Sequence, residues 1–78
     1  MSKIKVGQIY RYTTHTNLVF VITQSYDDNT RFDYIDNNGV TSGYICEHDV
    51  LYKTELIAEY PTWQEAVNSK EFNDVAED

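Results

Sequence analysis

Apolar and polar residues alternate along the first half of the chain, a pattern that predicts half-buried β-strands. We expect three strands there, at residues 8–13, 18–26 and 30–36. The second strand is apolar at every position from 18 to 22, which is typical of a central strand buried on both faces. The polar sequences His15-Thr16-Asn17 and Asp27-Asp28-Asn29 favour turns between these strands.

The sequence Asn37-Asn38-Gly39 predicts a hairpin turn, because Asn and Gly tolerate the left-handed backbone that such turns require. A fourth strand follows at residues 40–46. A three-residue loop places Phe32 opposite Tyr44, whereas a two-residue loop at 38–39 shifts the register by one residue. The sequence is compatible with both registers.

The segment after this hairpin predicts a fifth strand. Residues 47–53 fit either a helical turn or a strand. Along residues 55–60, alternate side chains would point to opposite faces of a strand. One face would carry Leu56, Ala58 and Tyr60, and the other Ile57 and Glu59. Pro61 ends this strand, because proline has no amide hydrogen to donate to a sheet.

One helix is predicted near the C-terminus. Thr62 and Glu65 match the capping-box pattern, in which two side chains satisfy the free amides at a helix start. The helix begins at Trp63 and ends near Lys70, and we expect Phe72 to close the core beyond it.

Together these elements predict a mainly β fold with one C-terminal helix, built on a small five-stranded antiparallel sheet or an SH3-like barrel. A two-layer α+β arrangement is the alternative. We expect a single domain at residues 1–72 and a flexible acidic tail at residues 73–78. The sequence Val6-Gly7-Gln8-Ile9-Tyr10, which opens on a turn, is similar to the first strand of many bacterial and phage SH3-like domains.

Charge narrows the choice of partner. Thirteen acidic and six basic residues give this chain of 78 residues a net charge of −7. Surfaces that bind nucleic acids or anionic membranes need clustered Lys and Arg, so we expect neither as a direct partner. The single cysteine excludes an intrachain disulfide, and there is no apolar leader or membrane span, so a cytoplasmic location is expected.

The sequence contains no motif that supports catalysis or a cofactor. Cys46 and His48 are the nearest approach to a nucleophile–base pair, but no oxyanion-hole or glycine-rich pattern accompanies them. A zinc site needs four ligands, and His15 is the only other histidine. Phosphate-binding loops are also missing. We therefore predict a non-enzymatic protein without a metal or cofactor.

Carboxylates around the predicted hairpin form the candidate partner-binding site, which consists of Asp27, Asp28, Asp33, Asp36, Glu47 and Asp49. Side chains two residues apart on a strand lie about 6.6 Å apart on one face. Neighbouring phosphates of a DNA strand have a similar spacing, so a row of carboxylates can imitate DNA for a basic protein. The alternative is a solvated acidic face that keeps a small protein soluble.

The small size, acidic balance, aromatic-rich strands and missing catalytic motifs resemble the early proteins by which bacteriophages disable host machinery. In particular, the chain resembles the DNA-mimic type, such as phage inhibitors of the histone-like protein HU. This resemblance implies an inhibitor of a basic host protein of the nucleoid or of transcription, acting in the host cytoplasm. The sequence is compatible with a monomer or a dimer.

The tyrosines support a second hypothesis. There are seven, at positions 10, 12, 26, 34, 44, 52 and 60. Exposed tyrosines combine an apolar ring with a polar hydroxyl and suit protein interfaces. The alternative function is therefore a small SH3-like module that binds a peptide or a protein assembly through tyrosines, with the acidic charge serving only solubility.

Overall fold

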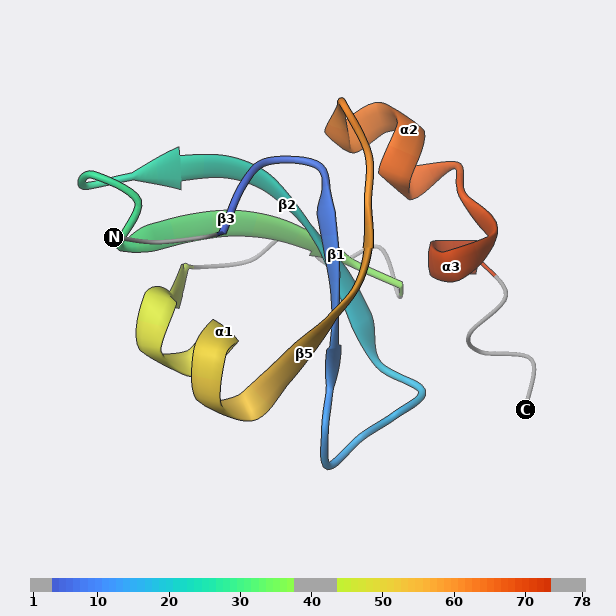
Figure 1. Cartoon of the computed structure of the whole chain (residues 1–78), viewed down its shortest axis with the longest axis horizontal. Coiled ribbons are helices and arrows are strands. Elements are labelled where there is room, and N and C mark those ends of the chain that lie inside the picture. The colour runs from blue at the N-terminus through green and yellow to red at the C-terminus, as the bar shows by residue number, and fades with distance from the viewer. Residues whose placement is uncertain (1–3, 38–43, 74–78) are drawn as a thin grey trace.

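The computed structural model describes residues 4–37 and 44–73 and shows an antiparallel sheet that curls into a half-barrel (Figure 1). The strands are β1 (Gln8–Tyr12), β2 (Val19–Tyr26), β3 (Arg31–Asp36), β4 (Ile45–Cys46) and β5 (Thr54–Glu59). Their order across the sheet is β4-β3-β2-β1-β5, with β2 in the centre as predicted. The mainly β prediction is confirmed, and this half-barrel is compatible with an SH3-like fold.

Within the described residues, three short helices accompany the sheet instead of the single helix predicted. They are α1 (Glu47–Lys53), α2 (Trp63–Val67) and α3 (Lys70–Asn73). The ambiguous segment between β4 and β5 is thus helical, and α1 connects the two edge strands of the sheet. Figure 1 shows α1 on one side of the sheet, and α2 and α3 on the other.

The alternating side chains of β2 build a separate core on each face of the sheet. Phe20 and Ile22 are buried on the face toward α1, which contributes Val50. Val19 and Val21 are buried on the opposite face with side chains of α2 and α3. The prediction that this strand is buried on both faces is confirmed, and it explains why the segment is continuously apolar.

The alternation predicted for the fifth strand fails at one position. The β1–β5 register shifts between Ile9 and Tyr10, so that Ile9 lies opposite Ala58 while Tyr10 lies opposite Leu56. The alternation predicts that Leu56 and Ala58 share one face. Because Ile57 is an extra residue in β5, they instead pair with Tyr10 and Ile9, whose side chains point to different faces of the sheet. Leu56 consequently remains exposed, and Ala58 packs against the core beneath α2.

The pairing of β3 with β4 decides between the two hairpin registers. Phe32 lies opposite Ile45, so the pairing of Phe32 with Tyr44 is wrong, and the alternative one-residue shift describes these strands. This register buries Ile45 beside Phe32 and leaves Tyr44 outside, whereas the other would reverse them. Residues 38–43, where the turn itself was predicted, lie outside the described residues.

The C-terminal helix begins where predicted but is interrupted. Thr62 accepts a hydrogen bond from the backbone N–H of Glu65 at 3.2 Å, which confirms the cap. The chain then turns at Ser69, whose hydroxyl donates to the carbonyl of Ala66 and accepts from the N–H of Phe72. Because Ser69 caps a second helix, Phe72 turns back into the core. Of the predicted tail, residue 73 ends α3, and residues 74–78 lie outside the described part.

A close backbone approach fixes the turn before β1. Gly7 has a φ of +96°, its N–H donates to the carbonyl of Ile22, and its carbonyl accepts from the N–H of Tyr60. A Cβ atom at Gly7 would lie 2.3 Å from the Tyr60 carbonyl oxygen. Glycine is therefore required here by both conformation and space.

Candidate partner-binding surface

The structure divides the six predicted carboxylates between two places. Four of them lie where β2 turns into β3, and these are Asp27, Asp28, Asp33 and Glu47. Glu47 belongs to this group because its N–H donates to the carbonyl of Thr30, in the turn, at 2.9 Å. The other two, Asp36 and Asp49, lie at the opposite end of β3 and on α1.

The six carboxylates do not form a single row. Phe32 and Tyr34 face the core beneath α1, whereas Ile35 faces the core beneath α2. By strand alternation, Asp33 shares the face of Ile35, and Asp36 lies on the other face. The row of evenly spaced charges considered from the sequence is therefore reduced to the group at the hairpin end.

The β2–β3 turn holds its acidic residues in an unusual backbone conformation. Asp27, Asp28 and Asn29 have φ angles of 50°, 57° and 69°, so three consecutive non-glycine residues are left-handed. Asp and Asn tolerate this region better than other side chains. The turn predicted from these residues is confirmed, and its geometry presents two carboxylates at the tip of the hairpin.

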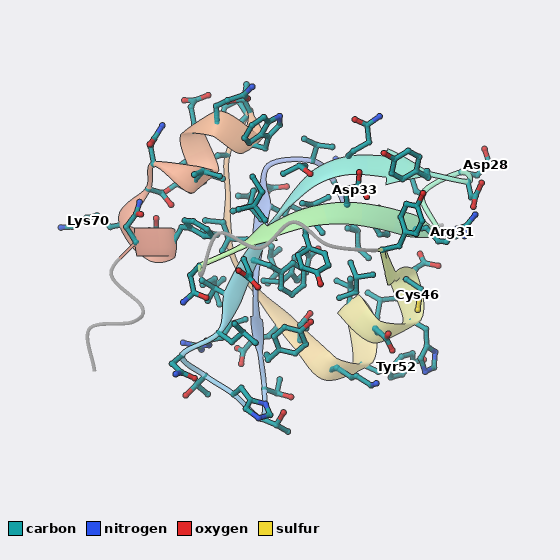
Figure 2. All side chains as sticks on the ribbon, turned by 180° about the vertical axis from the view of Figure 1, so that it is seen from behind. Asp28, Arg31, Asp33, Cys46, Tyr52 and Lys70 are labelled. Carbon is teal, nitrogen blue, oxygen red and sulfur yellow. The ribbon has the colours of Figure 1, made fainter. Side chains whose placement is uncertain are left out.

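A single arginine lies among these carboxylates (Figure 2). Arg31 Nε donates to Asp27 Oδ2 at 2.6 Å, and Nη2 forms an ion pair with the same oxygen. The guanidinium carbon also lies 5.3 Å from the centre of the Tyr44 ring, within the range of a cation–π contact. Arg31 is thus held by a carboxylate and an aromatic ring at once.

Two exposed tyrosines complete this group. Tyr26 donates to Asp33 Oδ2 at 2.7 Å, and this hydrogen bond, with a smaller contribution from burial, raises the pKa of Tyr26. The Tyr26 and Tyr44 rings meet edge to face with centroids 5.5 Å apart. We call this set, Tyr26, Asp27, Arg31, Asp33 and Tyr44, the hairpin-end patch.

The sequence argument missed three members of the patch, namely Tyr26, Arg31 and Tyr44. A signal for the first two was present, since residues flanking a four-residue turn lie opposite each other, as Tyr26 and Arg31 do. Tyr44 could not be placed, because its position depends on the β3–β4 register.

A second surface contains the other candidate tyrosines. A cavity of about 410 Å³ lies between the β1–β2 turn and the end of α1. It is lined by Tyr12, Thr13, Thr14, His15, Tyr52 and Lys53. Tyr52 is 75 % exposed, and its ring lies 4.6 Å from that of His48. Lys53 pairs with Asp49 at 3.4 Å, so one of the six predicted carboxylates borders this cavity.

Tyr12, which lines this cavity, also lies near the two predicted carboxylates that are not at the hairpin end, Asp36 and Asp49. Burial raises the pKa of Tyr12, and the nearby Tyr34, Asp49 and Asp36 raise it further. Asp36 and Asp49 therefore act on the face of the sheet that carries α1. They belong to a different surface from the hairpin-end patch.

The remaining candidate groups are separated. Cys46 is the half-buried residue before α1, and the His48 ring packs on Tyr52. Among residues 4–37 and 44–73, no three His, Cys, Asp or Glu side chains gather as metal ligands, and none of the helices found there is long and apolar enough to cross a membrane.

No protein-family model, curated protein or solved structure matches this chain.

Proposed function

We propose that this protein is a non-enzymatic inhibitor that binds a basic protein through the carboxylates at the end of the β2–β3 hairpin. The observation that carries this proposal is the fixed geometry of the acidic group. Asp33 is oriented by Tyr26, and Asp27 by Arg31. Because these side chains are already ordered, binding would cost them little further conformational entropy.

The balance of charge supports a basic partner. The acidic group at the hairpin end contains four carboxylates and one arginine, in a protein whose net charge is −7. Such a field accelerates the approach of a positively charged surface and repels nucleic acid. A DNA-mimic inhibitor of a nucleoid or transcription protein, of the kind that phages direct against HU, has these properties, and it would act in the host cytoplasm.

Affinity capture tests this proposal. The immobilised protein is exposed to a bacterial lysate at low and high salt, and bound proteins are identified by mass spectrometry. We expect basic nucleic-acid-binding proteins at low salt only, because screening weakens contacts between exposed charges. Duplex DNA should compete for them. Capture that is unaffected by salt and DNA, or turnover of a hydrolase substrate, would contradict the proposal.

Two variants with equal loss of acidic side chains locate the surface. The first changes Asp27, Asp28 and Asp33 to Asn, and the second ends the chain after Asn73, which removes Asp74, Glu77 and Asp78. The hairpin variant should release the captured protein faster, since it loses ordered contacts. The truncation should only slow association modestly. Loss of binding with the truncation alone would place the site elsewhere.

A second function is favoured by the cavity between the β1–β2 turn and α1. Its volume is within the range of ligand sites, and Tyr52 stands exposed beside it. An SH3-like interaction module that binds a peptide would use Tyr12 and Tyr52. Its binding would resist salt, would not respond to DNA and would be lost on Tyr52→Ala.

A further inference from the structure

We propose that the hairpin-end patch is a recognition site for an arginine side chain of the basic partner, and that Arg31 competes for it as a resident guanidinium. This inference rests on the proposed function, because it names the chemical group that the acidic hairpin end would bind. It goes further by assigning the tyrosines a direct role and by giving Arg31 an opposing one.

The contacts of Arg31 show that the patch suits a guanidinium. Its Nε and Nη2 both pair with Asp27, and its planar group lies over the Tyr44 ring. Arginine pairs with carboxylates through its planar guanidinium group and stacks on aromatic faces, which suits it to interfaces. Both are provided here on the surface, since Tyr44 is 62 % exposed.

The patch retains capacity beyond what Arg31 uses. Asp33 accepts from Tyr26 through Oδ2, and Oδ1 of Asp33 has no hydrogen-bond donor in the described part of the chain. The hydrogen bond from Tyr26 to Oδ2 also fixes the direction of Oδ1. The edge of Tyr26 meets Tyr44, so that two rings and a carboxylate converge beside Arg31. Tyrosines of this kind frequently dominate the energetics of binding at interfaces.

Arg31 should therefore weaken the binding of an external arginine. It neutralises Asp27 and covers part of the Tyr44 ring. Replacing it with Gln would free both groups while leaving the aromatic pair and Asp33 in place. A residue that merely supports the site would have the opposite effect when removed, since the site would lose order.

A direct binding measurement separates these possibilities. The probe is a fluorescent peptide of alternating arginine and glycine, with blocked ends, titrated by anisotropy at low salt. Arg31→Gln is compared with Lys70→Gln, which changes the net charge equally on α3, at the opposite end of the molecule (Figure 2). Tyr44→Ala is compared with Leu51→Ala, which removes another exposed apolar side chain from α1, outside both candidate surfaces.

We expect Arg31→Gln to bind the peptide about two- to fivefold more tightly than Lys70→Gln does. Tyr44→Ala should weaken binding by about two- to fivefold, and Leu51→Ala should leave it unchanged. Tyr44→Leu, which keeps an apolar side chain without a ring, should weaken binding as Tyr44→Ala does. Circular dichroism of each variant confirms that the sheet is retained.

The possible failures are distinguishable. If Arg31→Gln binds no better than Lys70→Gln, or Tyr44→Ala binds as the unmodified protein does, the inference is overturned. The proposed function then still stands if the Asn variant of Asp27, Asp28 and Asp33 loses the peptide. If the unmodified protein does not bind the peptide at low salt, both proposals are overturned.

Discussion

Two tyrosine-centred networks, one joining β1 and β5 and the other joining β2 and β3, differ mainly in burial. In the first, Tyr10 donates to Gln8 Oε1 at 2.6 Å, and Gln8 Nε2 donates to Glu59 at 3.0 Å. Gln8 and Tyr10 are only 4 % and 6 % exposed. In the second, Tyr26 donates to Asp33 on the surface, beside the Arg31–Asp27 pair.

The difference in burial gives the two networks different uses. Water cannot replace a lost partner around Gln8, so each hydrogen bond there holds β1, β5 and the turn before β1 in one arrangement. Around Asp33 water is available, and exchanging an internal contact for an external one costs little. The buried network therefore determines the fold, and the exposed one is suited to binding.

The largest effect is expected beside the buried network, from Gly7→Ala. The added Cβ would meet the Tyr60 carbonyl, and alanine is strained at a φ of +96°. We expect a loss of about 3 kcal/mol in the free energy of unfolding, measured by urea denaturation. A loss below about 1 kcal/mol would mean that the turn adapts and that the backbone around the buried network is less rigid than proposed.

Alkaline pH should act on the same network. Burial, and to a lesser degree Glu59, raises the pKa of Tyr10 from 10.0 to about 12. A raised folded-state pKa means that this stabilisation is complete below pH 10 and is lost as the pH rises toward 12. We expect a loss of about 2 kcal/mol over this interval, taken as the difference between the unmodified protein and Tyr10→Phe. If the free energies of unfolding of the unmodified protein and of Tyr10→Phe fell in parallel over this interval, the raised pKa of Tyr10 would be contradicted.

At neutral pH, Tyr10→Phe should lower the free energy of unfolding by about 1–2 kcal/mol. The variant retains the ring, so the stacking of residue 10 on Phe20 is preserved and only the hydroxyl is lost. Chemical denaturation at pH 7 measures the change. An unchanged stability would show that Gln8 finds another donor, and the contrast between the networks would be weaker than proposed.

The matched change in the exposed network is Tyr26→Phe. It removes the hydrogen bond to Asp33, but we expect much less destabilisation than from Tyr10→Phe, because water solvates the freed carboxylate. The same denaturation assay applies. A cost equal to that of Tyr10→Phe would contradict the distinction between a buried network that determines the fold and an exposed one that binds.

The smallest effect concerns a second tyrosine–carboxylate pair, which is also exposed. Tyr60 donates to Glu71, and this hydrogen bond is the largest cause of the lowered pKa of Glu71. A carboxyl group whose pKa is lowered in the folded state stabilises the fold at pH values above its unfolded-state pKa. This stabilisation is lost as the pH falls through the folded-state pKa. Tyr60→Phe should return the Glu71 pKa toward its ordinary value in an NMR titration. No change would mean that the pair is not formed in solution.

Local sequence signals were sufficient to place β1, β2, β3 and β5, the C-terminal helix start and the first turns, whereas of the fourth strand predicted at residues 40–46 the described residues show only Ile45–Cys46. The double burial of β2 follows from its unbroken apolar run, and the helix start follows from Thr62 and Glu65. Such signals lie within a few residues, so tertiary contacts did not alter them. Asp27, Asp28 and Asn29 likewise form the turn expected of them.

Only the tertiary structure decided how distant segments align. The choice of Ile45 over Tyr44 beside Phe32 depends on which side chain the core beneath α1 accommodates. The extra residue at Ile57 is likewise defined only by the pairing of β5 with β1. A one-residue shift changes no local preference but reverses every face, which is why alternation alone could not settle the register.

The same reason applies to the candidate site. The sequence established the number of acidic residues and their proximity along the chain, but not their faces. Strand alternation and the β2–β3 turn gathered Asp27 and Asp33 around Arg31 and separated them from Asp36. The β3–β4 register then placed Tyr44 over Arg31. Composition determined that this protein is acidic, and cross-strand geometry determined where its charge is concentrated, since electrostatic contacts depend on distance in space rather than in sequence.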